Sequence, residues 1–141
     1  MYNYKKYGSD VLTSALTQFE YRNSQIPSDK MDEIWDITLR TNITNTRIKR
    51  VMGRYYPKKK LIEVFPHLAN DNLLSYKDTI LHELAHHITN VLYKGQASHG
   101  RAWKMVCKSI GAIPSAKEQT IELNDKWHTC RNTEFYAKYK I

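Results

Sequence analysis

The sequence predicts an α+β fold in which a helix, a short sheet and two further helices follow one another along the chain. An apolar stripe with helical spacing begins near residue 10, and segments rich in β-branched and aromatic residues lie between residues 34 and 65. The helical period returns after residue 75. A chain of 141 residues has the size of one domain. We therefore expect residues 1–141 to form a single domain, with a core over about residues 10–112 and a basic tail over about residues 118–141.

The first half of the chain is expected to supply one helix and about three strands. Ser9 or Asp10 can cap the first helix, which should end before Pro27. Alternating or β-branched segments then predict the strands, and a Pro-Lys-Lys-Lys segment predicts a turn between the last two. The predicted strands span residues 34–43, 48–56 and 61–65, and the turn spans residues 57–60.

The second half of the chain is expected to be helical before it becomes irregular. Ser75 to Asp78 matches a capping box, and a helical apolar period continues from there until Gly95. A shorter helix should begin near Ser98 and end at Gly111. The tail from residue 118 shows little periodicity, so it is expected to be irregular with at most one short element.

The motif His82-Glu83-Leu84-Ala85-His86 lies in the middle of the longer predicted helix. Residues four positions apart stack on one helix face, so the two imidazoles can reach a single metal ion with Glu83 beside it. An ion with three protein ligands and one open position lowers the pKa of water, and a neighbouring carboxylate can then move the proton. The motif therefore predicts a metal-dependent hydrolase.

Two histidines require a third ligand, and the spacing favours His99, which follows His86 by thirteen positions. Ser98 could cap the helix that carries it, and Gly100 would allow a close backbone approach. A carboxylate farther along the chain stays an alternative; the candidates are Glu118, Glu122 and Asp125. A metzincin site is excluded, because that pattern requires glycine at position 89 and its third histidine at position 92, where this chain has Thr89 and Leu92.

The remaining histidines are not expected to bind the ion. His87 points about 100° around the helix from His86, so we expect it to lie behind the ligands or to face solvent. His67 and His128 are isolated in the sequence and are interpreted as ordinary surface or hydrogen-bonded histidines.

Residues 79–87 together with Ser98-His99-Gly100-Arg101-Ala102-Trp103 resemble the SprT-like metalloproteases, whose pattern is HExxH, a short loop, then His-Gly and an aromatic residue. The resemblance covers about residues 10–112. It implies a small zincin-like domain with a short antiparallel or mixed sheet, and one Zn²⁺ held by His82, His86 and His99. It also implies Glu83 as the general base of peptide-bond hydrolysis. The family includes the Spartan proteases, which cut proteins crosslinked to DNA.

One departure from that family concerns a second zinc. Many bacterial members end in a four-cysteine zinc ribbon, whereas Cys130 is followed by no further cysteine in this chain. The other cysteine, Cys107, lies in a different segment, and we expect both thiols to be reduced. A second, structural zinc is therefore not expected.

The chain is basic, with a formal net charge of +8 and a pI near 9.5, which favours polyanionic partners. No acidic residue lies between Thr41 and Ile62. Aromatic residues lie near the cations of this segment and near those of the basic tail, and their rings could stack on bases. They are Tyr55, Tyr56, Trp127, Tyr136 and Tyr139. The alternative is a solvated hairpin edge whose lysines discourage strand pairing. The candidate nucleic-acid contacts are Arg47, Lys49, Arg50, Arg54, Lys58, Lys59 and Lys60.

We therefore expect a zinc-dependent peptidase that acts on DNA-associated proteins, with non-specific DNA as a possible partner. Residues 61–65 are the predicted edge strand along which an extended substrate would lie. Two alternatives are a non-catalytic zinc-containing DNA-binding module and a hydrolase of another substrate, such as cell-wall peptide. The longest apolar runs are far shorter than the roughly 20 residues of a membrane span, and no secretory signal is recognised, so we expect a cytoplasmic protein without a membrane partner.

Overall fold

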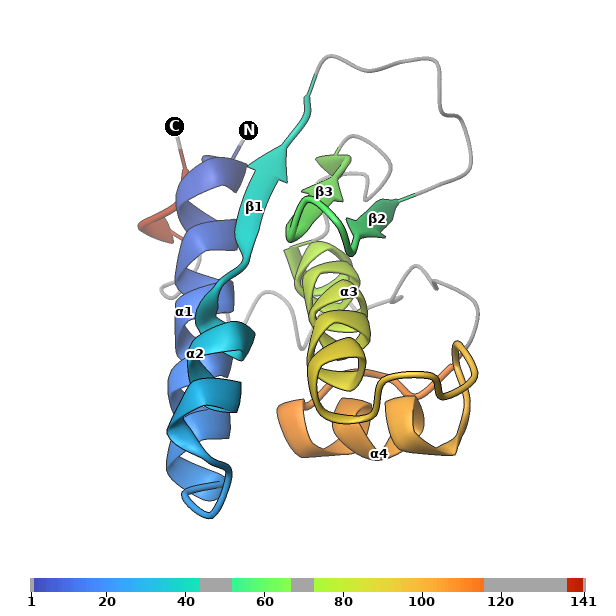
Figure 1. The fold of residues 1–141 in the computed structure, drawn as a ribbon. Coiled ribbons are helices and arrows are strands. Elements are labelled where there is room, and N and C mark those ends of the chain that lie inside the picture. The colour runs from blue at the N-terminus through green and yellow to red at the C-terminus, as the bar shows by residue number, and fades with distance from the viewer. Residues whose placement is uncertain (1, 44–51, 67–72, 116–136, 141) are drawn as a thin grey trace.

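The computed structural model describes residues 2–43, 52–66, 73–115 and 137–140. These residues form four helices and a three-stranded mixed sheet (Figure 1), so the predicted α+β class with an N-terminal helix is confirmed. The elements in chain order are α1 (Tyr4–Arg22), α2 (Ser28–Trp35), β1 (Thr38–Thr41), β2 (Gly53–Tyr56), β3 (Leu61–Val64), α3 (Leu73–Leu92) and α4 (Arg101–Ile110).

The first helix is longer than the sequence predicted. The side chain of Asn3 accepts a hydrogen bond from the backbone N–H of Lys6, and it caps α1 in place of Ser9 or Asp10. Gly8 then lies where α1 meets β1; a Cβ atom there would be 2.9 Å from the Leu39 side chain. α1 ends at Arg22, before Pro27 as predicted.

The helix α2 was missed, and the strand predicted from residue 34 was wrong at its beginning. Pro27 precedes the helix, which buries only Met31 and Ile34 and is too short to establish a helical period in the sequence. The strand β1 starts later, at Thr38. The turn at residues 57–60 is confirmed, whereas residues 48–51 of the second predicted strand lie outside the described residues.

The order of the strands is β1-β3-β2, with β1 parallel and β2 antiparallel to β3. β3 is therefore the central strand, and the prediction that residues 61–65 form an edge was wrong. All four residues of β3 are buried, as expected for a strand paired on both sides. Among the described strands, β2 is the edge that faces the cleft described below.

The helix α3 occupies the centre of the fold, with the sheet above it and α4 below it in Figure 1. Its apolar side packs into the core through Ile80, Leu84 and Ile88, each of which is fully buried. The capping box predicted at Ser75 was wrong, because α3 has already begun at Leu73 and Ser75 is buried within it. The second part of the core lies between α3 and α4, where Trp103, Val106 and Cys107 face inward.

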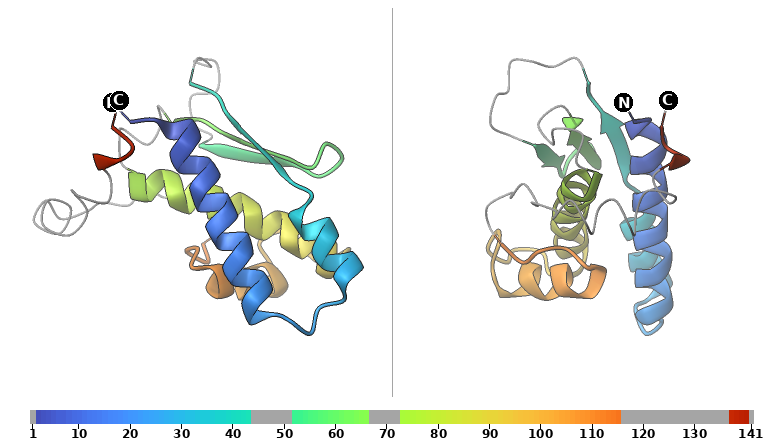
Figure 2. Two further views of the ribbon diagram at one scale, coloured as in Figure 1. Left: turned by 90° about the vertical axis from the view of Figure 1, so that its left-hand side faces the viewer. Right: turned by 180° about the vertical axis from the view of Figure 1, so that it is seen from behind.

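The two ends of the described chain lie side by side (Figure 2). Tyr2 forms an isolated antiparallel bridge with Lys140, and Tyr139 donates a hydrogen bond of 2.7 Å to Asp10 on α1. Because Tyr139 is only 1% exposed, it cannot stack bases, and that expectation was wrong. Trp127 and Tyr136 lie outside the described residues. None of the helices among the described residues has the length and hydrophobicity of a membrane-spanning segment.

Gly53 allows β2 to approach α3, because a Cβ atom there would lie 2.8 Å from the Thr79 side chain and 3.3 Å from Cγ of Glu83. We expect Gly53→Ala to lower the free energy of unfolding by about 1–3 kcal/mol, since α3 and β2 would have to separate. Urea unfolding measures this change, with Arg54→Ala at the neighbouring exposed position as the control. Equal stabilities of the two variants would contradict the close packing described for Gly53.

Candidate metal centre

His82 and His86 lie one turn apart on one side of α3. His82 is only 3% exposed and His86 is partly buried. Their ring centroids are 5.1 Å apart. The helix therefore presents two imidazoles to one point, as the motif predicted.

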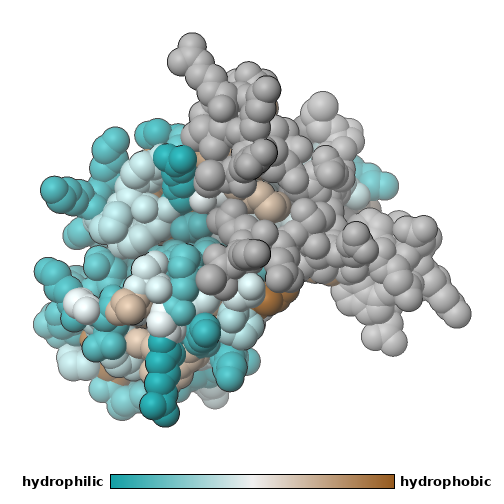
Figure 3. Space-filling view, turned by 90° about the vertical axis from the view of Figure 1, so that its right-hand side faces the viewer, coloured by the Kyte–Doolittle hydropathy of each residue, from teal (hydrophilic) through white to brown (hydrophobic). Residues whose placement is uncertain are grey.

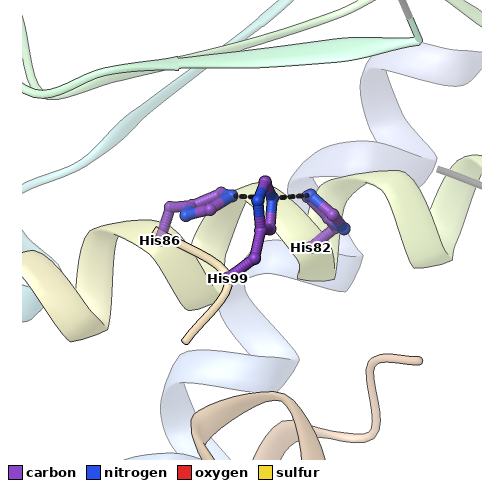
Figure 4. A group of neighbouring side chains, drawn as sticks. All are labelled: His82, His86 and His99. Carbon is purple, nitrogen blue, oxygen red and sulfur yellow. Dashed lines mark hydrogen bonds between the residues drawn. The ribbon is translucent and has the colours of Figure 1, made fainter. Parts of the chain in front are cut away.

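His99 reaches the same point from the loop between α3 and α4 (Figure 4). Its backbone is left-handed, with φ of 58°, which is uncommon for a residue with a side chain. Two expectations are corrected here: His99 precedes α4 rather than lying on it, and Gly100 instead of Ser98 occupies the N-cap position. The loop bends back toward α3 after Gly95, whose φ is 90°.

The three ring nitrogens are spaced to bind one metal ion. Nε2 of His99 lies 3.0 Å from Nε2 of His86 and 3.3 Å from Nε2 of His82, and all three ligand atoms lie within 4.8 Å of one another. Tetrahedral zinc with nitrogen ligands at about 2.0–2.1 Å requires nitrogens about 3.3 Å apart. The donor type and the spacing thus both fit such an ion. Among the described residues, this is the one group of histidine, cysteine or carboxylate side chains with that property.

Trp103 of α4 packs against all three histidines. The centroids of its ring system and of the His82, His86 and His99 rings are 4.9, 5.2 and 4.7 Å apart, and the indole is fully buried. Its Nε1–H also points to the backbone carbonyl of His82, at 3.5 Å. Trp103 therefore restricts the orientations that the three rings can take.

The electrostatic environment keeps the His86 ring neutral. Burial, with the adjacent His82 and His99, lowers the pKa of His86 to about 3. A neutral imidazole has a free nitrogen lone pair, which is the form that binds a metal ion.

Glu83 and the histidines line one open cleft of about 910 Å³. Glu83 is 5% exposed, it lines the same cleft as the three histidines, and its Cγ would lie 3.3 Å from a Cβ atom at Gly53 of β2. Residues of β2 form one wall of the cleft. The opposite wall continues along α3 and the following loop through Asn90, Tyr93 and Gln96. The cleft is therefore long enough to extend well beyond the histidines.

The other sequence candidates do not join this cluster. His87 is 2% exposed, so the expectation that it could face solvent was wrong, and its ring contacts Tyr55 instead of the three ligands. Burial lowers the pKa of His87 as well. The alternative ligands Glu118, Glu122 and Asp125 lie outside the described residues, as do His67 and His128.

The candidate nucleic-acid contacts are only partly described. Arg54, Lys58 and Lys59 are exposed on β2 and the turn after it. Lys60 forms a 2.7 Å ion pair with Asp36, so its charge is offset. Arg47, Lys49 and Arg50 lie outside the described residues.

The structure also shows a cationic surface that the sequence analysis missed. Arg101, Lys104 and Lys108 are exposed on one face of α4, and none of them forms an ion pair with a described residue. Their spacing of three and four residues is the sequence signal that could have identified this face.

Comparisons with known proteins agree with the geometry. The sequence pattern of the SprT-like family matches residues 19–126, which is most of the chain. A protein of Oceanobacillus iheyensis named "Protein SprT-like" is 33% identical over 69 residues. That match covers 48% of this chain and 46% of the relative, so the chain spans about half the length of that protein. No solved structure gives a significant match.

The metal centre predicts a specific loss of affinity when the loop histidine is removed. We expect His99→Ala to reduce Zn²⁺ affinity more than about 100-fold, because removing a ligand should exceed the 10- to 100-fold effect of removing a residue that only supports a ligand. Competition with a chromogenic chelator measures the affinity, and Ser98→Ala in the same loop is the matched control. Unchanged affinity in His99→Ala would exclude His99 as the third ligand.

Proposed function

This chain belongs to the SprT-like family, and we propose that it is a zinc-dependent metallopeptidase that hydrolyses peptide bonds in DNA-associated proteins. The observation that carries the proposal is the convergence of three imidazole nitrogens in an open cleft that Glu83 also lines. Zinc would be held by His82, His86 and His99. An ion held by three protein ligands keeps a position open for reaction, whereas structural zinc sites have four protein ligands.

Bound zinc would polarise the peptide carbonyl and lower the pKa of a water molecule. Glu83 is the residue that would handle protons. Its carboxylate would accept a proton from the attacking water and donate it to the leaving amine nitrogen as the C–N bond breaks. The packing of Glu83 against Gly53 supports this role, because it limits the positions of the side chain to the wall of the cleft.

The substrate is proposed to lie along β2 rather than β3. β2 is the edge strand on the cleft side, and its backbone is free to pair with an extended peptide along the described part of that edge. Backbone pairing gives affinity without selecting many side chains, so we expect loose sequence specificity.

The role of Glu83 predicts the outcome of a single substitution. We expect Glu83→Gln to retain zinc and to lower kcat/KM by about 10²–10⁴-fold, which is the usual contribution of a general base. Cleavage of a panel of DNA-binding proteins by zinc-loaded wild type and variant measures this. Retained cleavage in the variant would exclude Glu83 as the base, and a zinc-loaded wild type that cleaves nothing would favour a non-catalytic binding module.

Two groups of exposed cations support the proposed DNA partner. We call Arg54, Lys58 and Lys59 the turn cations and Arg101, Lys104 and Lys108 the α4 cations. Arg54 lines the cleft, and Arg101 follows His99 by two residues, so one cation of each group is near the proposed active site in the structure or in the sequence. The side of the molecule that carries this loop is largely hydrophilic where it is described (Figure 3). DNA bound there would bring its attached proteins to the cleft.

The contribution of each group to DNA binding can be measured from the salt dependence of that binding. We expect the triple glutamine variant of either group to weaken binding to a duplex and to reduce the slope of log K against log salt by up to about 0.9 for each phosphate that is no longer neutralised. Fluorescence anisotropy measures the affinity for the duplex at several salt concentrations from about 50 to about 200 mM, the range in which phosphate contacts change affinity strongly. An unchanged slope in both variants would contradict the proposed surface.

A further inference from the structure

His87 follows a proposed metal ligand directly, yet its ring makes contacts on another side of α3. Its Nδ1 lies 2.8 Å from the hydroxyl oxygen of Tyr55 on β2. Its Nε2 lies 3.1 and 3.0 Å from the backbone carbonyl oxygens of Glu33 and Ile34 on α2. One buried ring therefore connects the central helix to the edge strand and to a second helix.

The direction of these hydrogen bonds follows from the partners. Carbonyl oxygens only accept, so Nε2 of His87 must carry the hydrogen atom. In a neutral imidazole the other nitrogen is then an acceptor, and the hydroxyl group of Tyr55 donates to Nδ1. The ring of Tyr55 adds an edge-to-face contact with His87, with centroids 5.4 Å apart. Both polar atoms of the buried ring are thus used.

Tyr55 is the one side chain of β2 that can hold this strand onto α3. Side chains alternate between the faces of a strand, and Gly53 and Tyr55 share the face toward α3. Gly53 has no side chain. Arg54 and Tyr56 belong to the opposite face, where the Tyr56 hydroxyl group donates to Glu63 at 3.2 Å.

The position of β2 matters because the strand forms a wall of the cleft. β2 pairs with β3 along one edge only in the described sheet, so its height above α3 depends on contacts through Tyr55. Tyr55 also separates the cleft from a smaller hollow between α2 and α3, and it lines both of them. A displaced Tyr55 would therefore allow the wall to move.

We propose that His87 is a positioning residue that acts through Tyr55: it fixes the distance between the substrate-binding edge of β2 and the catalytic groups on α3. This inference rests on the proposed function, because it assigns β2 to the substrate. His87 and Tyr55 touch neither the metal ligands nor Glu83 in the contacts described above. Loss of the Tyr55 hydrogen bond should therefore weaken substrate binding and leave the chemical step largely unchanged.

The test uses the zinc-loaded full chain with Tyr55→Phe, which removes one hydroxyl group and keeps the ring. A net hydrogen bond contributes about 0.5–1.5 kcal/mol, so KM for a peptide substrate should rise about 2- to 10-fold with kcat and zinc content retained. Amide hydrogen exchange of residues 53–56 should become faster. His87→Leu should give the same pattern, and His87→Gln, which keeps a donor and an acceptor, should restore much of the wild-type behaviour.

Tyr139→Phe is the matched control, since it also removes a single tyrosine hydroxyl group, one that donates to Asp10 on α1 and does not line the cleft. We expect its KM to stay near that of the wild type. Equal effects of Tyr55→Phe and Tyr139→Phe, or unchanged exchange of residues 53–56 in Tyr55→Phe, would overturn the proposal. Hydrogen exchange decides this even if the wild type cleaves no peptide, so failure of the proposed function and failure of the positioning role give different results.

Discussion

The arrangement of this protein depends on holding three imidazole nitrogens close enough to share one ion. α3 supplies two of them through its own period, with His82 and His86 one turn apart. The third comes from His99, which lies in the loop after α3 and has a left-handed backbone conformation. Its Nε2 lies 3.0 Å from Nε2 of His86. Trp103 then packs beneath all three rings, so the start of α4 and the metal centre form one packed unit.

The same helix also organises the edge strand of the sheet. Glu83 lies against Gly53, and His87 forms a hydrogen bond with Tyr55, so two successive inward positions of β2 contact residues that are next to the proposed metal ligands in sequence. One face of α3 thereby carries two histidines of the candidate metal centre, and we propose that a neighbouring face sets the distance to the proposed substrate strand. β2 is short and pairs only with β3 among the described strands. Its distance from α3 therefore depends on the contacts between its side chains and that helix.

The features that local sequence determines were predictable. The motif at His82 to His86 lies on a helix with a clear apolar period, and His99 was favoured by its proximity in sequence. The order of the strands was not predictable. β1 pairs with β3 although β2 lies between them in the sequence, and no local sequence pattern indicates such a long-range pairing. The helix α2 was missed because eight residues give too little periodicity, and the contact of His87 with Tyr55 depends on that same unpredicted packing.

The most direct measurement is X-ray absorption at the zinc edge of the metal-loaded protein, because it counts the ligands that this chain supplies. We expect one Zn²⁺ per chain with three imidazole nitrogens at about 2.0–2.1 Å and a fourth position left to solvent. A fourth protein ligand would show a closed structural site and would contradict a hydrolytic role. Coordination by fewer than three imidazoles would contradict the centre formed by His82, His86 and His99.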